Sequence, residues 1–281
     1  MTEFKSFYKT VQGGEGDRCS YPTRLDTYGC GCAHNCEYCY ARSLLAFRGL
    51  WNPHDPAVAD IVKIRRKLDK IPAGQVLRLG GMTDCFQPCE ALQGVTHKTL
   101  KLLNARGIGY LIVTKSALVA SDKYMDVLDK GLAHIQISIT ATDDAVADQY
   151  EKASPISDRI KAIERLYDAG YDVQIRLSPY VPQFVDIEKI NAIRCDKILV
   201  EFLRCNGFIR RTFPIDYSDY TYKDGNYYHL PLDRKLALLA GIKNKQVTVC
   251  EDATDHYEYF KNNFNPNPND CCNLRRNDAD S

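Results

Sequence analysis

The chain has 281 residues, of which 44% are hydrophobic and 26% charged, a composition typical of one large globular domain or two small ones. This balance excludes a disordered or fibrous protein. The 37 basic and 36 acidic side chains leave a formal net charge of +1, so no global field attracts a nucleic-acid backbone. No run approaches the roughly 20 apolar residues of a membrane helix. The N-terminus lacks an apolar signal region, which predicts a cytoplasmic location.

The chain contains 12 cysteines. In a reducing compartment, cysteines serve as metal ligands or reactive thiols more often than as disulfides. The cysteines are therefore the first place to look for chemistry.

Short β-branched runs alternate along the chain with helical patterns, after a polar, glycine-rich opening at residues 10–18. Apolar positions recur at three and four residues in 159–167, and Gly170 stands where that helix would end. Strand–helix alternation of this kind predicts a parallel sheet with right-handed crossovers. The expected strands are residues 76–79, 110–113, 135–139, 173–177, 198–202 and 247–249.

These units predict an α/β fold, a partial (β/α)6 barrel of parallel strands with a C-terminal extension. The expected parts are an N-terminal arm at 1–23, the barrel at 24–245 and a cysteine-containing extension at 246–281. Residues 216–228 are rich in Tyr, Asp and Gly, which favours a hairpin or an irregular insertion. From residue 262 the chain becomes a polar Asn/Pro tail.

Polar residues follow the expected strands directly. Thr83 and Asp84 follow the first, Lys115 the second, Thr140 the third and Ser178 the fourth. In parallel α/β folds the chemistry lies where strands end and loops begin. These residues are therefore expected to lie at one functional end of the barrel.

The strongest motif is C-x3-C-x2-C, formed by Cys32, Cys36 and Cys39. Three thiolates on one short loop can each hold one iron of a four-iron cluster and leave the fourth iron open. Cys30 lies just before them, so a closed zinc knuckle of four thiolates is the alternative. Zinc knuckles usually draw ligand pairs from separated turns, and this crowding favours the cluster.

With Tyr38 and Tyr40 included, the motif C-x3-C-x-Y-C-Y resembles the signature of radical S-adenosylmethionine (SAM) enzymes. The resemblance extends over most of residues 25–202. Within that superfamily the chain looks most like the spore photoproduct lyase-like branch. Four stretches carry this comparison: residues 80–88, 113–116, 137–140 and 151–155.

The resemblance implies that Cys32, Cys36 and Cys39 bind a [4Fe-4S] cluster and that SAM chelates its fourth iron. The cluster would cleave SAM reductively to a 5′-deoxyadenosyl radical that abstracts hydrogen from substrate, with electrons from a donor of flavodoxin or ferredoxin type. Lys115 matches the position that contacts the SAM carboxylate, and Ser138 matches another SAM contact.

Four further residues complete the expected site. Tyr40 is expected to stack near the adenine, and Tyr38 with Tyr40 matches a tyrosine pair assigned to hydrogen transfer in the lyase. Thr83 and Asp84 are expected beside the cofactor. Each of these residues, like Lys115 and Ser138, also has a purely structural interpretation, as a packed ring, a core hydroxyl, a cap or an ordinary strand-end lysine.

The chain departs from the lyase at the cysteine that donates hydrogen to the thymine product radical. The matching position is Gly81 or Met82, and Cys85 lies a few residues later as a candidate substitute. Repair of the thymine photoproduct is therefore in doubt.

Cys250 follows an expected strand, and Cys271 and Cys272 are adjacent in the polar tail. These three cysteines predict a second iron–sulfur cluster with His256 or Cys205 as a fourth ligand. Zinc at the same residues, or three unrelated packed thiols, are the alternatives.

Cys19, Cys89 and Cys195 have no recognisable spacing and are expected to be structural. Arg176 lies on a strand, where burial without an anion is costly. It is therefore a candidate for holding polar groups of SAM or substrate. An internal salt bridge, such as Glu201 with Arg204, is the structural alternative.

Three functions remain open from the sequence. The first is a radical SAM enzyme acting on a thymine-like nucleobase, in DNA repair or modification. The second is a radical SAM enzyme acting on a peptide or small metabolite with an auxiliary cluster. The third is a non-catalytic iron–sulfur or zinc protein that senses redox state or binds a partner.

Overall fold

The computed structural model describes residues 4–9 and 18–274 of the chain. The strands are β1 (Phe7–Lys9), β2 (Thr23–Leu25), β3 (Tyr28–Gly29), β4 (Ala57–Val58), β5 (Val76–Leu79), β6 (Gly109–Thr114), β7 (Ala133–Ile139), β8 (Asp172–Tyr180), β9 (Lys197–Phe202), β10 (Tyr222–Asp224), β11 (Tyr227–His229) and β12 (Gln246–Val249). The helices are α2 (Tyr40–Phe47), α3 (Ile61–Leu68), α4 (Glu90–Gln93), α5 (Val95–Asn104), α6 (Asp122–Met125), α7 (Asp144–Asp148), α8 (Ile156–Asp168), α9 (Ile187–Ala192), α10 (Gly207–Thr212), α11 (Leu232–Leu239) and α12 (Thr254–Asn263).

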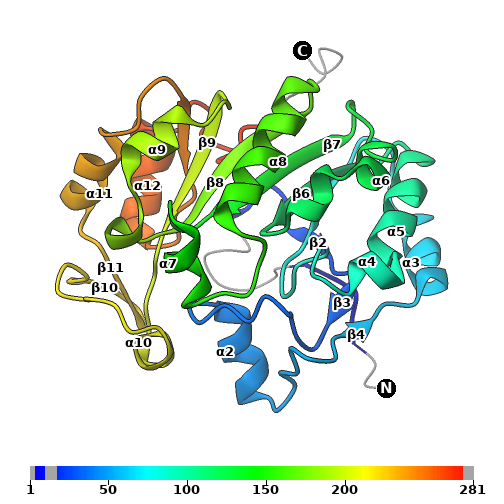
Figure 1. Cartoon of the computed structure of the whole chain (residues 1–281), viewed down its shortest axis with the longest axis horizontal. Helices are drawn as coiled ribbons and strands as arrows, with labels where there is room; N and C mark the ends of the chain where they lie inside the picture. Colours follow the sequence, from blue (N-terminus) through cyan, green and yellow to red (C-terminus); the bar gives the residue numbers. More distant parts are fainter. Residues whose placement is uncertain (1–3, 10–17, 275–281) are drawn as a thin grey trace.

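One large sheet organises the molecule (Figure 1). Its strand order is β1-β2-β5-β6-β7-β8-β9-β12, and every neighbouring pair is parallel except β1 with β2. All six strands expected from the sequence are present, and β2 adds a seventh parallel strand at the start. The prediction of a partial barrel with parallel strands is confirmed, and β1 and β12 form its two edges.

Side chains alternate between the two faces of this sheet, as the two-residue period of a strand requires. On β7, Ile135, Ile137 and Ile139 belong to the main hydrophobic core, whereas Gln136 and Ser138 point to the other face. We call that other face the lumen. The same alternation places polar and apolar residues of the other strands there: Arg24, Val76, Arg78, Leu111, Val113, Gln174, Arg176, Leu199, Glu201 and Thr248.

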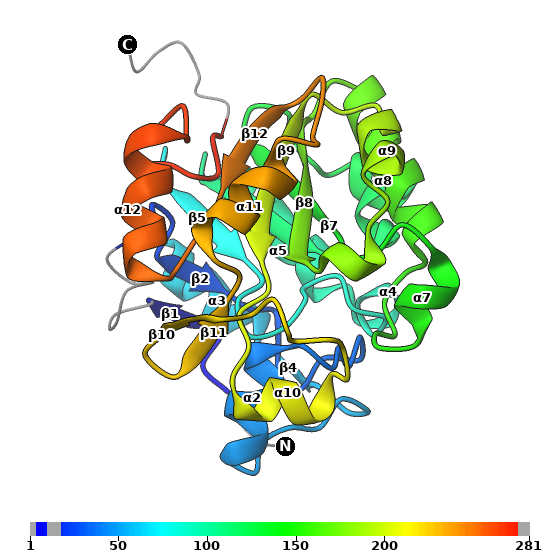
Figure 2. The ribbon, with the colours of Figure 1, turned by 90° about the vertical axis from the view of Figure 1, so that its left-hand side faces the viewer.

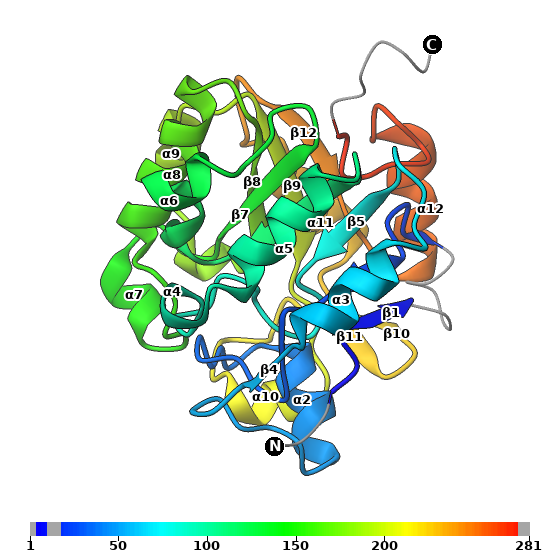
Figure 3. The same ribbon diagram turned by 90° about the vertical axis from the view of Figure 1, so that its right-hand side faces the viewer.

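Helices cover the outer face of the sheet (Figures 1 and 3). The longest, α8, begins after Pro155 and ends before Gly170, whose φ of 81° is the left-handed conformation that glycine adopts readily at a helix end. The helix α3 is capped by Asp60, whose carboxylate accepts hydrogen bonds from the backbone of Val62 and Lys63. None of the helices among the described residues is long and apolar enough to cross a bilayer.

Residues 216–228 contain the hairpin expected there, because β10 pairs antiparallel with β11. The helix α10, which precedes this hairpin, lies beside α2 at one end of the molecule (Figures 1 and 2). The chain therefore brings a segment near residue 210 against the helix that follows the cysteine motif.

The C-terminal segment covers the open side of the partial barrel, on the side where α12 lies in Figure 2. The side chain of Asn265 stabilises the edge strand β12, since it accepts a hydrogen bond from Val249 N (2.8 Å) and donates one to Val249 O (2.9 Å). The Tyr21 hydroxyl, just before β2, donates to the Asp270 carboxylate at 2.7 Å. Residues close to both termini thus bridge the two sides of the sheet. The strand β12 belongs to this sheet, although the sequence analysis placed it in the C-terminal extension at 246–281.

Candidate active site

The cysteine motif lies on the loop between β3 and α2. Two successive turns shape it, because Asn35 N donates to Cys32 O (3.0 Å) and Cys39 N donates to Cys36 O (3.3 Å). Asn35 has a φ of 43°, a left-handed conformation that asparagine tolerates well. Cys32 and Cys36 are buried and Cys39 is half-buried. The local sequence therefore places three thiols on one short, tightly turned loop, which we call the cysteine loop (residues 30–40).

Segments remote in sequence hold the cysteine loop in place. Gln87 Oε1 accepts a hydrogen bond from Ala33 N (2.9 Å). Lys152 N donates to His34 O (2.6 Å), and Glu37 N donates to Tyr150 O (2.9 Å). The partners of Ala33 and His34 come from the stretches 80–88 and 151–155, two of those that carry the family resemblance. The loop conformation is therefore specified by the barrel and not by the cysteine motif alone.

The thiols of the cysteine loop are not gathered as closely as the ligands of a zinc knuckle. The sulfurs of a four-thiolate zinc site lie about 3.8 Å apart, given tetrahedral geometry and Zn–S bonds of about 2.3 Å. Within the described ranges, the donor atoms of three or more His, Cys, Asp or Glu residues lie within 4.8 Å of one another at His229, Glu251 and Asp252, and no such set includes a cysteine. Thiols spaced more widely fit a four-iron cluster, in which each thiolate binds a different iron.

Lys115 lies beside the cysteine loop, as expected. Its ammonium is 5.5 Å from the centre of the Tyr38 ring. Burial and the Glu151 charge raise the pKa of Cys36 to about 12, and the Lys115 charge opposes this rise. A cation at the end of β6 therefore faces the thiol loop, where a carboxylate ligand would find a charge-assisted partner.

Asp84 joins the ends of β5 and β6. Its carboxylate accepts hydrogen bonds from Thr114 Oγ1 (2.8 Å), Lys115 N (2.7 Å) and Phe86 N (2.8 Å), and lies 3.4 Å from His34 Nδ1. The neighbouring Thr83 hydroxyl donates to Tyr28 O at 2.6 Å. Asp84 and Thr83 thus position Lys115 and the start of the cysteine loop. That either residue contacts a cofactor directly stays a prediction.

Tyr38 and Tyr40 have different environments. Tyr38 is 8% exposed, its hydroxyl donates to the Glu151 carboxylate, and its ring packs edge-on against Tyr150 and Phe213. The hydroxyl of Tyr40 donates to Gly81 O, and its ring lies 5.6 Å from the Arg204 guanidinium. Both rings are packed against the barrel, and their roles in hydrogen transfer or adenine stacking remain predictions.

Ser138 and Arg176 both face the lumen, on the neighbouring strands β7 and β8, where they are paired in register. The Arg176 guanidinium donates to Gln136 Oε1 (2.7 Å) and forms an ion pair with Glu201. Burial by itself would raise the pKa of Glu201, but Arg176 and the Ser178 hydroxyl lower it to about 2. Glu201 therefore takes part in an internal salt bridge with Arg176, while Arg204 pairs with Asp252 and its charge also lowers the pKa of Glu201.

Cys85 lies away from the lumen. It is 1% exposed, belongs to the hydrophobic core beneath the helices, and its thiol lies 3.6 Å from Leu25 O, to which it donates. Burial raises the pKa of this thiol strongly. The structure thus gives Cys85 the surroundings of a packed structural residue, and its role as hydrogen donor stays a prediction.

Glu151, which has no role in the sequence analysis, is buried at the centre of the contacts that hold the cysteine loop. Its carboxylate receives the Tyr38 hydroxyl, the Thr140 hydroxyl (2.9 Å) and an ion pair from Arg159, and both charged side chains are 1% exposed. Burial alone would raise the pKa of Glu151, but the Arg159 and Lys115 charges hold it below its usual value. The signal available in the sequence was Arg159, a charged residue between Ile156 and Ala162 on the buried face of α8. A buried cation at this position requires an anionic partner such as Glu151.

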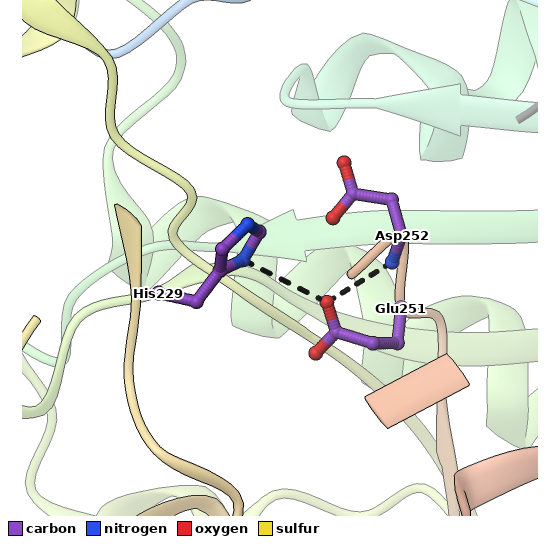
Figure 4. Close-up of side chains that lie close together, drawn as sticks. All are labelled: His229, Glu251 and Asp252. Atoms are coloured by element: carbon purple, nitrogen blue, oxygen red, sulfur yellow. Dashed lines mark hydrogen bonds and ion pairs between the residues drawn. The ribbon is translucent and has the colours of Figure 1, made fainter. Parts of the chain in front are cut away.

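His229, Glu251 and Asp252 gather close enough to suggest a metal site (Figure 4). However, the buried Lys235 ammonium pairs with Glu251, and Arg204 pairs with Asp252. Burial lowers the pKa of His229 to about 4, although Glu251 opposes the shift. Two cations already neutralise the two carboxylates, so this group is an ion-pair network that fastens α11 to the end of β12.

The C-terminal cysteines lie together, but neither expected fourth ligand joins them. Cys250, Cys271 and Cys272 pack against the same lumen residues. His256 Nδ1 accepts a hydrogen bond from Lys235 Nζ (2.9 Å), and the Cys205 thiol donates to Tyr228 O (3.4 Å). His256 therefore contacts α11, and Cys205 contacts the hairpin formed by β10 and β11.

Comparison with known families gives a clear match. The model of the radical SAM superfamily matches residues 27–190, which include the cysteine loop and strands β3 to β8. The chain is 29% identical over 168 residues to an uncharacterised protein of Methanocaldococcus jannaschii, which covers 57% of this chain and 61% of that protein. It is 25% identical over 167 residues to an uncharacterised protein of Mycobacterium tuberculosis, covering 56% of this chain and 49% of the relative.

Solved structures show the same fold. A cysteine-to-alanine variant of spore photoproduct lyase superposes with a TM-score of 0.61 at 17% identity, over 90% of this chain and 78% of that one. A lyase variant with bound AdoMet and dinucleoside spore photoproduct gives a TM-score of 0.56 at 17% identity, over 89% and 77% of the two chains. The alignments with the curated relatives span about half to three fifths of those proteins.

We predict that Glu151→Gln destabilises the protein by about 3–5 kcal/mol, because it leaves the buried Arg159 guanidinium without a counter-charge. Denaturant unfolding of the metal-free protein measures the change in the free energy of unfolding. The control is Asp148→Asn, which removes an exposed ion pair with Lys152 (2.9 Å) and should change stability by less than about 1 kcal/mol. Equal effects of the two substitutions would show that Glu151 does not hold the loop.

Proposed function

Because the chain belongs to the radical SAM superfamily, we propose that it is an enzyme that cleaves SAM reductively and abstracts hydrogen from a substrate. Enzymes of this superfamily use a [4Fe-4S] cluster and SAM, and they need a reductant. When bound, the cluster and SAM supply a 5′-deoxyadenosyl radical. The observation that carries the proposal is a tightly turned loop with three thiols that is held by the barrel beside Lys115.

In this proposal, different residues of the chain bind the cluster, bind SAM and position the SAM-binding lysine. Cys32, Cys36 and Cys39 supply the three thiolates, and the open fourth iron leaves room for SAM. Lys115 neutralises the SAM carboxylate by a charge-assisted hydrogen bond. Asp84 positions Lys115 through the backbone bond at 2.7 Å.

Other predicted residues act around this core. Ser138 and Arg176 present polar groups to SAM or substrate from the lumen, and Tyr40 borders the adenine side of the site. Tyr38 holds the loop through Glu151. The buried aromatic rings around Tyr38 exclude water from the loop.

The proposed substrate is a thymine-like nucleobase. The support is the similarity of 90% of the chain to spore photoproduct lyase, one of whose solved structures holds a dinucleoside photoproduct. Gly81 or Met82 replaces the donor cysteine of the lyase, and Cys85 is buried in the core. This difference favours base modification over photoproduct repair, because modification does not require a protein thiol to return hydrogen.

A peptide or small metabolite is the second candidate substrate. The grouping of Cys250, Cys271 and Cys272 in the lumen favours it, since an auxiliary cluster there would stand close to substrate. The formal charge of +1 also provides no general attraction for a polynucleotide.

The proposed electron donor is a small flavodoxin or ferredoxin, and the proposed location is the cytoplasm. All 12 cysteines are free thiols, which is consistent with a reducing compartment.

Cys36→Ala should abolish release of 5′-deoxyadenosine from SAM under anaerobic, reducing conditions, because one iron loses its ligand. Chromatographic quantification of 5′-deoxyadenosine measures the loss. Cys89→Ala, which removes a half-buried thiol at the start of α4, is the control and should retain activity. Continued SAM cleavage by the Cys36 variant would refute the cluster assignment, and absence of cleavage by the wild type would favour a non-catalytic iron–sulfur or zinc protein.

Lys115→Ala should weaken SAM binding roughly tenfold to a hundredfold while leaving the iron content unchanged, because a hydrogen bond to a charged group contributes about 1.5–3 kcal/mol. Calorimetric titration of the reconstituted protein with SAM measures the affinity. Lys152→Ala removes an exposed ammonium near the same loop and should bind SAM normally. Unchanged affinity in the Lys115 variant would remove that residue from the SAM site.

Perdeuterated thymidine nucleotides should transfer deuterium into 5′-deoxyadenosine, since the radical takes hydrogen from its substrate. Mass spectrometry of the product detects the label, with deuterated adenosine nucleotides as the control. Unlabelled product with every nucleotide, together with label from a deuterated peptide, would replace the nucleobase with the second candidate.

A further inference from the structure

Four cysteines from three distant parts of the chain meet in the lumen. Cys250 follows β12 directly, and the Cys271 thiol lies beside the thiols of Cys250 and Cys272. Cys272 is buried against Leu111 and Leu199 of the lumen. The fourth member is Cys19, which had been expected to be structural.

Hydrogen bonds on either side of Cys19 fix its place beside the other three. The Arg18 guanidinium donates to Asp252 O, two residues after Cys250. The Ser20 hydroxyl donates to Asn269 O, and the Tyr21 hydroxyl to the Asp270 carboxylate (2.7 Å). Burial raises the pKa of the Cys19 thiol, Arg78 opposes the shift, and the neighbouring Cys272 and Cys250 thiols add to it. The segment before β2 therefore runs alongside both segments that carry the other thiols.

The adjacent cysteines are held in an ordered turn. Asp270 is 5% exposed and accepts hydrogen bonds from Cys272 N (3.0 Å) and Leu274 N (3.3 Å). Lys197 Nζ donates to Asn273 O at 3.1 Å, which ties the turn to the start of β9. A polar segment is thus folded into the lumen so that two successive thiols enter it.

Cationic groups of the lumen surround the four thiols. The Arg78 and Arg176 guanidinium groups both lower the pKa of Cys272, against the effect of its burial, although its hydrogen bond with Cys271 is the largest cause of the lowering. The buried Nε of Arg78 has no hydrogen-bond partner among residues 4–9 and 18–274. A group of thiolates with net negative charge would supply an anion beside the unpartnered Nε of Arg78.

We propose that Cys19, Cys250, Cys271 and Cys272 bind a second [4Fe-4S] cluster. Within the described part of the chain, no three of these thiols all lie within 4.8 Å of one another, whereas the sulfurs of a four-thiolate zinc site lie about 3.8 Å apart, so the spacing favours a cluster over a single zinc ion. Four thiolates can ligate all four irons of a cluster. The second cluster is therefore closed, and it holds no open iron for a substrate.

A closed cluster can serve as an electron carrier, and the structure connects it with the first thiol group. Asp252, two residues after Cys250, pairs with Arg204. The Arg204 guanidinium lies over the ring of Tyr40, the residue that follows Cys39. The two thiol groups thus border one lumen. The proposal that the second group binds a cluster does not rest on the proposed reaction.

The decisive variant is Cys32→Ala/Cys36→Ala/Cys39→Ala, which leaves the second thiol group intact. After anaerobic reconstitution we expect about eight irons and eight sulfides per chain in the wild type and about four of each in this variant. Electron paramagnetic resonance of the reduced variant should still show an iron–sulfur signal. Loss of all iron from a variant with unchanged circular dichroism would overturn the proposal.

The matched variant replaces Cys19, Cys250, Cys271 and Cys272 by serine in the wild-type background. It should retain about four irons and still release 5′-deoxyadenosine from SAM, so failure of the second site is separable from failure of the proposed function. Cys195→Ser, whose thiol donates to Val173 O (3.5 Å), is the control and should keep about eight irons. Stoichiometric zinc in the Cys32/Cys36/Cys39 variant, or eight irons retained by the quadruple serine variant, would refute the assignment.

Discussion

The alternation of side chains along the parallel strands is the constraint on which the other features depend. One face of each strand must be apolar to pack under the helices, as Ile135, Ile137 and Ile139 do on β7. The other face is then free to carry polar groups, and it carries Gln136 and Ser138. Because the sheet curves without closing, these polar residues line a shared lumen. The site is therefore built from the residues on the face of the sheet that does not pack into the hydrophobic core.

Polar groups in such a lumen need partners, and the observed pairs are mostly long-range. Arg176 on β8 pairs with Glu201 on β9, and Glu151 before α8 receives both Arg159 and the Tyr38 hydroxyl. The Glu151 contacts link the cysteine loop to the barrel at a distance of more than 100 residues in sequence. A buried ion pair adds little net stability compared with apolar packing, but removing one partner is costly. Such pairs therefore fix the position of the loop more than they strengthen the fold.

The sequence was sufficient for the features that depend on local patterns. All six expected strands, the hairpin at 222–229 and the end of α8 at Gly170 follow from periodicity and turn residues. The short strand β2 was missed, because three residues carry too little periodicity to be distinguished from a loop. The spacing of Cys32, Cys36 and Cys39 identified the family because a single short loop contains the whole ligand set. Partner choice was not predictable in the same way: the sequence did not indicate the pairing of Arg176 with Glu201 or of Arg204 with Asp252.

Cys19 illustrates why the second thiol group could not be completed from sequence. It lies 231 residues before Cys250 and has no spacing motif, so only the meeting of the two sheet edges reveals it. The same meeting explains why the chain keeps two adjacent cysteines in a segment of polar composition. Arg18, Ser20 and Tyr21 form hydrogen bonds with the two segments that carry the other three cysteines. The contacts that close the open side of the barrel are therefore the same ones that bring the four thiols together. Since metal binding to four thiolates would also tie together β2, β12 and the C-terminal turn, a cluster there would stabilise the closed barrel as well as carry electrons.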